Sequence, residues 1–592
     1  MTTINQQPFY LSDKSNTLFC WMHTGQSYLP SKDCAVIVCN PFGYEYIRSH
    51  RSVRHFADTL ADAGFITIRF DYAGTGDSSG DDLDEDRIGV WKQNIRDLIA
   101  YTKKTTGCAN ICLVGIRMGA TLAALIASEN EISISHLILW SPCVQGRHYV
   151  REMKALAFSS APIAGTDTNI ESAGFILTAE TIEQITSLNI ESLSFPKETS
   201  MLLIDRDDRQ QYMRLLKKWT QGGCSIDYLV LSGYLSMFAE PHETVVPVDT
   251  IGKILEWLTK NSSEATSNIK EHSFDLIKQA DIHSSISEQL CHFGSRNQLF
   301  GVLATPLRAM DRVLPTVVLL NAGSVHHVGP QRIYAVIARA LAAQGFPCFR
   351  FDFEGIGDSN LQNVPHENHP YQESALQDTE SALHFLSERF SASQFIITGI
   401  CSGAYTGFRF GLETTPYKIR DILLINPLTF YWEQGRDLLM DAAKIHAIWK
   451  IAHYKQSVYD IKQWIKLMKG EIPWRGVVKT VLAQIKLFLK SFYRDATKTM
   501  LSHEETRLSA DIKAYLEKNL HLSFFLSDTD PGLDMILIDA KSVFRKGIKE
   551  KKIILQMFKD ADHTFSHTKK RDELISRLIA HLEQVSMRSG VA

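Results

Sequence analysis

A near-repeat of ten residues is the feature of this chain that most constrains its fold. Residues 69–78 read RFDYAGTGDS, and residues 350–359, 281 positions later, read RFDFEGIGDS. Solenoid repeats recur every 20–50 residues or so (about one supersecondary unit), whereas a single recurrence at this distance indicates a duplicated domain. The length of 592 residues also exceeds what one hydrophobic core supports, roughly 250–300 residues. We therefore expect two domains of one architecture.

Short apolar runs alternate with helical patterns in the same order around each copy. The predicted strands are residues 34–39, 65–70, 111–114, 136–140, 201–204 and 226–231, then 316–320, 348–351, 395–398, 422–425, 523–526 and 553–557. The predicted helices include residues 52–63, 90–103, 246–258 and 569–582. This alternation is typical of an α/β fold with a doubly wound, mostly parallel sheet in each domain. A polar stretch at 261–268 indicates a linker, so we place the domains at 1–262 and 263–592.

Composition and charge exclude several classes of function. A hydrophobic content of 44% and a formal net charge of -3 describe a globular protein that does not bind nucleic acid. The first residues lack a basic segment followed by an apolar one, and no apolar run reaches membrane-spanning length. The ten cysteines are scattered, without a CxxC pair or a Cys/His cluster of zinc spacing. We therefore expect reduced thiols in the cytoplasm, no metal and no cofactor.

The sequence GICSG at 399–403 has the pattern of a nucleophile on a tight turn, with Cys401 at its centre. It follows the predicted strand 395–398 and precedes a segment that can continue as a helix. Side chains two positions either side of Cys401 would collide with the neighbouring strand and helix, which explains both glycines. The start of the helix would place backbone N–H groups beside the thiol, where they favour the thiolate. The structural alternative is a small buried cysteine between ordinary turn glycines.

A cysteine nucleophile requires a histidine within hydrogen-bond reach and a carboxylate that orients it. In chain order, Asp530 follows the predicted strand 523–526, and His563 follows the predicted strand 553–557. The order nucleophile, acid, histidine at the carboxyl ends of successive strands is the order that this chemistry uses in a parallel sheet. We assign Asp530 as the acid and His563 as the general base, with Asp528 as the alternative acid. A turn aspartate and a helix-capping histidine are the structural alternatives.

The oxyanion of an acyl-transfer reaction needs backbone N–H donors beside the nucleophile. The pattern predicts the N–H groups of Ser402 and of Ser324, with Gly323 letting the second loop approach closely. His326 and His327 lie just beyond. They are candidates for the pocket lining, although loop histidines are more often exposed.

On the turn at 399–403, the loop at 350–359 and the sequence DHTF at 562–565, the second half resembles an α/β hydrolase over about 300 residues. The cysteine in the turn resembles that of dienelactone hydrolases, polyhydroxyalkanoate synthases and bile-acid-CoA acyltransferases. This resemblance implies two tandem α/β-hydrolase domains, of which the second is catalytic and carries a helical cap at about 431–518. It is specific for fold and mechanism and weak for substrate.

The first half departs from this pattern, because Arg117 occupies the nucleophile position in GIRMG at 115–119. A guanidinium stays protonated and cannot attack a carbonyl. Acidic residues and a histidine do stand where a triad would need them, namely Asp205, Asp207, Asp208 and His242. We expect a degenerate domain in which an internal carboxylate holds Arg117. The alternative is that Arg117 is an anion receptor at a helix N-terminus.

A second resemblance concerns the first half alone. The sequence LWSP at 139–142, with Gly146 and Arg147, resembles hydrolase-like proteins associated with exosortase gene clusters.

A strongly basic segment lies within the expected cap. Residues 441–500 contain twelve Lys or Arg and four Asp or Glu, together with apolar positions such as Trp449, Trp464 and Phe488. Such a cap would place an apolar acyl tunnel beneath a cationic rim. Two partners fit the rim, an acidic acyl-carrier protein or the phosphates of coenzyme A, and an anionic membrane surface is a third. A solvated helix face is the structural alternative.

These features predict a cysteine-dependent acyltransferase that moves an acyl group from a carrier-protein or CoA thioester to an amine, alcohol or thiol through an acyl-Cys401 intermediate. A thioesterase or carboxylic-ester hydrolase with the same Cys–His–Asp triad is the first alternative. A non-catalytic scaffold or binding protein is the second. The acyl chain, the acceptor, the role of the first half and the oligomeric state are left open.

Overall fold

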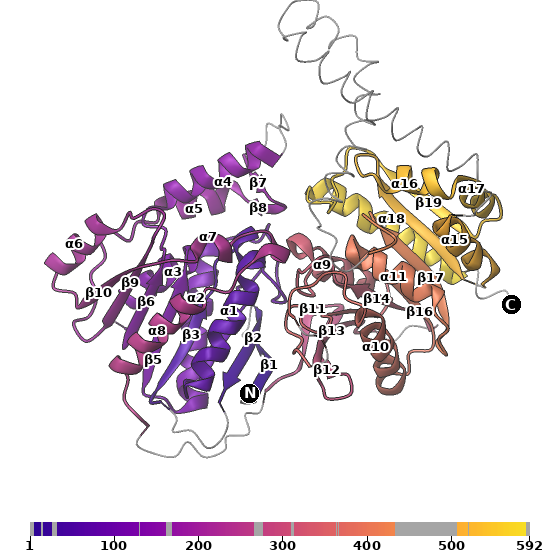
Figure 1. Cartoon of the computed structure of the whole chain (residues 1–592). Helices are drawn as coiled ribbons and strands as arrows, with labels where there is room; N and C mark the ends of the chain where they lie inside the picture. The colour runs from indigo at the N-terminus through magenta and orange to yellow at the C-terminus, as the bar shows by residue number, and fades with distance from the viewer. Residues whose placement is uncertain are drawn as a thin grey trace, which may run out of the picture.

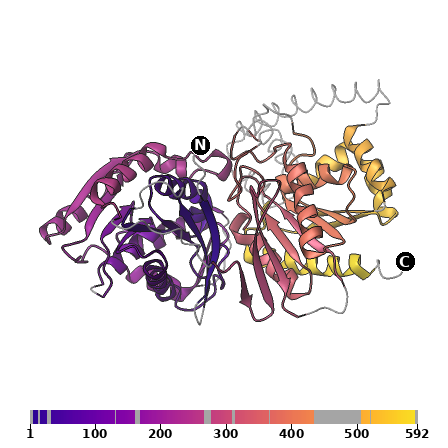
Figure 2. The same cartoon turned by 90° about the horizontal axis from the view of Figure 1, so that it is seen from below.

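The chain forms two large β-sheets side by side, one in each half, in a computed structural model (Figures 1 and 2), and a third sheet of two short strands belongs to the first half. The structure describes residues 5–12, 16–25, 32–129, 131–160, 168–265, 276–308, 313–362, 364, 366–432, 506–518 and 520–587. Most of the expected cap at 431–518, including the basic segment 441–500, lies outside the described residues, as do the last three residues of the predicted linker at 261–268.

The first sheet is antiparallel at one edge and parallel over the rest. Its eight strands, in spatial order, are β1 (Asn5–Ser12), β2 (Thr17–Thr24), β4 (Thr67–Phe70), β3 (Cys34–Cys39), β5 (Asn110–Ile116), β6 (His136–Trp140), β9 (Ser200–Arg206) and β10 (Ile226–Leu231). The β1–β2 and β2–β4 pairs are antiparallel, and the pairs that follow are parallel. The sequence pattern did not predict the antiparallel edge.

The second sheet repeats this order and adds one strand. Its nine strands are β11 (Gln279–His283), β12 (Ile286–Phe293), β13 (Leu299–Pro306), β15 (Cys348–Phe351), β14 (Thr316–Leu320), β16 (Phe395–Ile400), β17 (Ile419–Ile425), β18 (His521–Ser527) and β19 (Ile553–Phe558). From β12 onward each strand takes the place of its counterpart from β1 onward. The doubly wound α/β fold predicted from the two copies is therefore confirmed.

Helices cover both faces of each sheet, as this fold requires. In the first half, α1 (Tyr44–Asp62) and α8 (Val248–Asn261) pack on one face, and α2 (Arg87–Thr106) and α3 (Met118–Ala127) pack on the other. In the second half, α9 (Ile333–Ala343) and α18 (Thr568–Met587) cover one face, whereas the opposite face carries α10 (Ala375–Phe390), α11 (Ser402–Leu412), α15 (Arg507–Glu517), α16 (Gly532–Asp539) and α17 (Lys541–Lys549).

The remaining described elements are short or lie outside the two sheets. They are α4 (Gly146–Ser160), β7 (Ile170–Ser172), β8 (Phe175–Leu177), α5 (Ala179–Ser187), α6 (Met213–Gln221), α7 (Tyr234–Met237) and the 3-10 helices η1 (Pro241–Glu243) and η2 (Pro330–Arg332). The helix predicted at 52–63 begins earlier, at Tyr44, because the chain turns into it directly after the positive-φ Gly43. Within the described ranges, we find no helix with the length and apolarity that a membrane crossing demands.

Charged side chains of each copy of the repeated segment form ion pairs with side chains of the other copy. Arg69 of the first copy pairs with Asp358 of the second, and Arg350 of the second pairs with Asp77 of the first. All four side chains are at most 6% exposed. Because Arg69 and Arg350 are equivalent positions of the repeat, as are Asp77 and Asp358, the contact is reciprocal, like that between the subunits of a symmetric dimer.

An apolar cluster lies beside these ion pairs and also draws on both halves. Phe19 stacks on its counterpart Phe300 at a centroid distance of 6.2 Å, and Trp21 meets Phe300 edge-on at 4.7 Å. Tyr10 and Leu290 belong to the same buried cluster. Strands β2 and β13 are therefore covered by the other half, and the two halves share an internal core.

We expect Asp77→Ala and Asp358→Ala each to lower the free energy of unfolding by about 3–5 kcal/mol, because each removes one carboxylate partner from a buried arginine. Urea unfolding followed by circular dichroism measures the change. The matched control is Glu240→Ala, which breaks the exposed pair with Arg48 and should cost less than about 1 kcal/mol. Equal midpoints for all three variants would show that the reciprocal pairs do not stabilise the protein.

Candidate active site

Cys401 occupies a single-residue turn between β16 and α11. Its backbone φ of 59° and ψ of -114° lie in a region that side-chain-bearing residues rarely adopt. A Cβ on Gly403 would lie 2.5 Å from the carbonyl oxygen of Leu320, and one on Gly399 would lie 2.7 Å from the backbone of Gly403. The two glycines therefore let strand and helix approach closely enough to form the turn. Cys401 itself is partly exposed.

Asp530 and His563 lie together at the carboxyl ends of β18 and β19. The His563 Nδ1 atom and the Asp530 Oδ2 atom are 2.5 Å apart, and the Asp530 side chain is 3% exposed. Asp530 also accepts a hydrogen bond from the backbone N–H of Gly532. Asp528, the alternative acid, instead accepts a hydrogen bond from the backbone N–H of Asp560. The structure thus brings Asp530 to the histidine and holds Asp528 elsewhere.

Cys401 interacts electrostatically with His563. Burial lowers the pKa of His563, but the charge of Cys401 and the hydrogen bonds to Asp530 and Cys401 outweigh it and raise that pKa well above its usual range. The buried Nε2 atom of His563 makes no hydrogen bond of good geometry to any described residue. The thiol therefore lies close to the imidazole but is poorly aligned with its Nε2 atom.

The two predicted oxyanion donors lie on loops that are tied to each other. The Ser402 hydroxyl accepts a 2.7 Å hydrogen bond from the backbone N–H of Gly323 and donates to the carbonyl of Asn321 at 3.3 Å. Among described residues, the backbone N–H groups of Ser402 and Ser324 donate to no acceptor. Both are therefore available to a ligand.

The reason for Gly323 differs from the one predicted. A Cβ at this position would meet open space, so close approach is not what requires glycine. The requirement is its φ of 61°, a left-handed conformation.

Asn426, at the end of β17, is a residue that the sequence pattern did not identify. Its side-chain NH₂ group donates to the carbonyl of His563 at 2.8 Å and to the hydroxyl of Ser527 at 3.0 Å, and its side-chain oxygen accepts from the N–H of Ser527. Asn426 therefore fixes the histidine loop to the strand that precedes the acid. The sequence feature that could have identified Asn426 is its position directly after a predicted buried strand.

His326 and His327, the two loop histidines, are buried at the junction of the halves, where His326 lines a small cavity together with Ser324. His327 lies between two carboxylates: Nδ1 is 2.7 Å from Asp352, and Nε2 is 2.6 Å from Asp77 of the first half. Burial lowers the pKa of His327, but the charges of Asp352 and Asp77 raise it to about 10. His327 is therefore an imidazolium at neutral pH.

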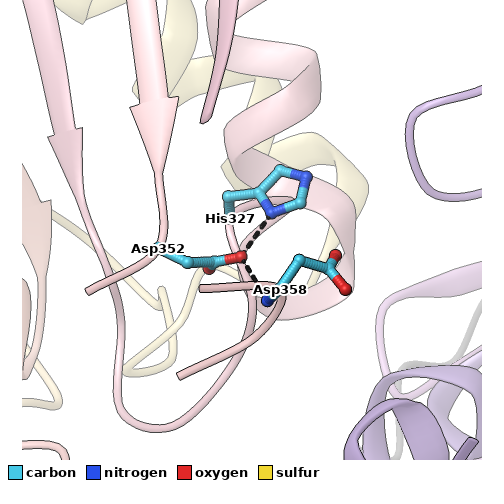
Figure 3. A group of neighbouring side chains, drawn as sticks. All are labelled: His327, Asp352 and Asp358. Atoms are coloured by element: carbon cyan, nitrogen blue, oxygen red, sulfur yellow. Dashed lines mark hydrogen bonds and ion pairs between the residues drawn. The ribbon is translucent and has the colours of Figure 1, made fainter. Parts of the chain in front are cut away.

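A metal ion would need the same atoms. His327, Asp352 and Asp358 lie close enough together for their ligand atoms to share one ion (Figure 3). Both nitrogens of His327 already face carboxylates, and an imidazolium cannot coordinate a metal. The Asp358 carboxylate points away from the other two side chains and pairs with Arg69. The donor set does not fit a metal, and the cluster is an ion-pair network.

The equivalent turn of the first half keeps its backbone and loses its nucleophile. Arg117 has a φ of 55° and a ψ of -118°, close to the values of Cys401. Its guanidinium pairs with the buried Glu45 at 2.6 Å and with the half-exposed Glu152 at 2.7 Å. Two carboxylates outweigh one guanidinium, so the local charge does not favour an anion. The predicted internal carboxylate is Glu45.

The remaining triad-like residues of the first half do not meet. Asp205 is buried and accepts hydrogen bonds from the backbone N–H groups of Gln211 and Tyr212 and from the Tyr228 hydroxyl. Asp208 pairs with Arg206, and the partly exposed His242 lies beside Glu243. These residues stabilise loops.

Comparison with known proteins extends over both halves. The family described as Serine aminopeptidase, S33, matches residues 35–179 and 315–480. The first range contains Arg117, the second contains Cys401, and together they exceed half of the chain. A monoglyceride lipase homolog of Monkeypox virus is 28% identical over 118 residues, which are 20% of this chain and 41% of that protein. The chain thus spans less than half the length of that relative.

Solved structures of similar fold cover about one half of the chain. Est1E from Butyrivibrio proteoclasticus, solved with ferulic acid, has a TM-score of 0.32 at 16% identity and covers 42% of this chain and 96% of its own. A thermostable carboxyl esterase from Bacillus coagulans has a TM-score of 0.32 at 12% identity and covers 44% of this chain and 99% of its own. TM-scores this low support no further comparison.

Asp530→Asn and Asp528→Asn form a matched pair that tests the acid. We expect Asp530→Asn to slow alkylation of Cys401 by iodoacetamide at pH 7 by about tenfold or more, because an amide cannot stabilise the imidazolium of His563. Asp528→Asn should react like the unaltered protein. Peptide mapping by mass spectrometry separates Cys401 from Cys224, the other partly exposed cysteine. The reverse order of rates would make Asp528 the acid.

The raised pKa of His327 predicts a pH dependence of stability. A histidine whose pKa rises from about 6.5 unfolded to about 10 folded stabilises the protein fully below pH 6.5, and this contribution disappears as the pH rises through 10. The difference in free energy of unfolding between the unaltered protein and His327→Gln should therefore be largest near pH 6 and shrink toward pH 10. A difference that grows with pH would contradict the assignment of His327 as an imidazolium.

Proposed function

The chain belongs to the α/β-hydrolase family of serine aminopeptidase S33, and we propose that its second half is a cysteine-dependent acyl-transfer enzyme. The observation that carries this proposal is the hydrogen-bonded pair His563–Asp530, with Cys401 on the strained turn beside it. A strained nucleophile, an imidazole and a buried carboxylate in this chain order form the machinery of acyl transfer.

Acyl transfer would proceed in two steps. In the first, His563 takes the proton of the Cys401 thiol, the sulfur attacks the acyl carbonyl, and the N–H groups of Ser402 and Ser324 stabilise the oxyanion. Collapse of the tetrahedral intermediate breaks the bond to the leaving group, which receives its proton from His563. In the second, His563 deprotonates an acceptor that attacks the acyl-Cys401 carbonyl, and the thiol leaves with the proton. Asp530 holds the imidazole in the required orientation throughout.

The sulfur nucleophile favours a thioester as donor, since thiols and thioesters exchange readily. We infer transfer from a carrier-protein or CoA thioester to an amine, alcohol or thiol. The basic segment 441–500 supports an anionic donor of this kind, and an anionic membrane surface is the competing ligand for the same charges. Tyr405, one helical turn after Cys401, packs against Tyr371, which stacks on Trp432, and this aromatic group provides an apolar contact for an acyl chain.

Hydrolysis is the second candidate and uses the same residues, with water as acceptor. The name of one similar protein, a monoglyceride lipase homolog, favours this candidate. In a third reading, the protein is a scaffold in which neither half is catalytic.

We expect incubation with short- and medium-chain acyl-CoA thioesters to add the mass of one acyl group to the intact protein at Cys401. Cys401→Ala should show no adduct, and His563→Ala should form it at least about a hundredfold more slowly, because the general base is lost. Intact-protein mass spectrometry followed by peptide mapping measures both. Adduct on Cys401→Ala at the same level would place the chemistry elsewhere.

The fate of the adduct distinguishes the candidates. Transfer predicts that an added amine or alcohol accumulates as its acyl conjugate, whereas hydrolysis predicts free acid and no conjugate. A protein whose Cys401 reacts with iodoacetamide no faster than a model thiol, with or without His563, would support the scaffold.

A further inference from the structure

Two loops carry the proposed machinery, and the first half contacts both. The loop after β14 carries Ser324, and the loop after β19 carries His563. The β7–β8 hairpin belongs to the first half and lies on the side that faces the second (Figure 1). A Cβ on Gly174, at its turn, would lie 2.2 Å from the Gln331 side chain and 3.0 Å from the Ser566 carbonyl oxygen. The hairpin therefore packs against both loops.

Glu171 of the hairpin binds the end of the histidine loop. Its Oε1 atom accepts two 2.6 Å hydrogen bonds, from the backbone N–H and from the hydroxyl of Thr568, the first residue of α18. Its Oε2 atom lies 3.6 Å from Nδ1 of His567. The Glu171 side chain is 31% exposed. A carboxylate from the first half thus caps the helix that follows His563.

The four residues between His563 and Thr568 form a closed turn. The Asp562 carboxylate accepts a 2.7 Å hydrogen bond from the N–H of Ser566, and the Asp562 carbonyl accepts one from the N–H of Phe565. Phe565 is buried in the core of the second half. These hydrogen bonds and this packing make the loop rigid. A displacement of Thr568 is therefore transmitted to His563.

The other loop is held by the first half in a similar way. His327 bridges Asp352 to Asp77, and the ring of His326 stacks on that of His50 at a centroid distance of 3.9 Å. Arg332, two residues after the loop, donates to carbonyl groups of the first-half segment 74–80. Both loops that flank Cys401 therefore depend on contacts from the first half.

We propose that the first half is a built-in positioning partner of the active site, and that Glu171 is the positioning residue that holds the His563 loop through Thr568. This proposal rests on the proposed function, because it assigns what Glu171 does for the Cys401–His563 pair. The degenerate half then has a role at the reaction centre although Arg117 has replaced its nucleophile. Glu171 touches neither Cys401 nor a substrate and acts only through the loop.

The test compares alkylation of Cys401 by iodoacetamide at pH 7 and pH 10 in the full chain. We expect Glu171→Ala to slow the reaction at pH 7 by about tenfold, the order of loss that a misplacement of about 1 Å produces. Glu171→Gln keeps an acceptor oxygen for Thr568 and should retain most of the rate. At pH 10 the three proteins should react alike, because a thiolate then forms without help from the imidazole.

Two controls separate positioning from general damage. Glu183→Ala, an exposed glutamate on α5 of the same region, should react like the unaltered protein. The melting temperature and the alkylation of the eight buried cysteines should not change in Glu171→Ala. If Glu171→Ala melts at a lower temperature than the unaltered protein, Thr568→Val tests the same contact from the second half. This variant removes only the hydroxyl donor to Glu171, so it should give a smaller loss of alkylation rate at pH 7 and no loss at pH 10.

The outcomes are distinguishable from those for the proposed function. A pH 7 rate that depends on His563 but is unchanged in both Glu171→Ala and Thr568→Val overturns the positioning role and leaves the proposed enzyme intact. An equal loss in Glu183→Ala also overturns it. A pH 7 rate that does not depend on His563 overturns the proposed function and, with it, the inference that rests on it.

Discussion

The reciprocal exchange of buried ion pairs between the halves is the constraint on which the rest of the structure depends. Arg69 with Asp358 and Arg350 with Asp77 are removed from water, so each charge is tolerated there only because the other half supplies its partner. Arg350 is also paired with Glu288, whose second oxygen binds Arg339. The two halves are therefore bound to each other by an ion-pair network in which every charged side chain needs its partner. The same packing of the two halves keeps the apolar contact between Phe19 and Phe300 away from water.

This constraint explains why the reactive residues are held so firmly. Asp358 lies on the loop after β15, and Asp77 lies on the equivalent loop after β4 in the first half. Because β15 neighbours β14, the loop of Asp358 is next to the loop that carries Ser324. His327 joins the network to that loop, and Asn426 joins the loop of the acid to that of the histidine. The turn at Cys401 is strained, and a strained turn persists only where its surroundings define it fully. Here those surroundings include the first half.

The first half has the same strand order as the second, but an arginine stands at its equivalent turn. Its turn retains the backbone conformation of the nucleophile, while Arg117 fills the position and Glu45 neutralises it. An arginine buried without a carboxylate would be costly, so the two residues stabilise the site as a pair. What the half still provides is surface: the reciprocal ion pairs, the covered strands and the β7–β8 hairpin. A domain used in this way needs its shape more than its original site.

The sequence by itself determined the duplication, the doubly wound sheets and the strand-turn-helix at Cys401, because each follows from local patterns of apolar residues and glycine. It also placed His563 and Asp530 at the ends of the correct strands, but it could not choose between Asp530 and Asp528, since one side chain reaches the imidazole only when the loop has its final conformation. Tertiary structure alone decided that His326 and His327 are buried, that β2 and β13 are covered, and that Glu171 meets Thr568. Each of these depends on residues hundreds of positions apart, whose proximity is set by how the two halves pack and not by any pattern along the chain.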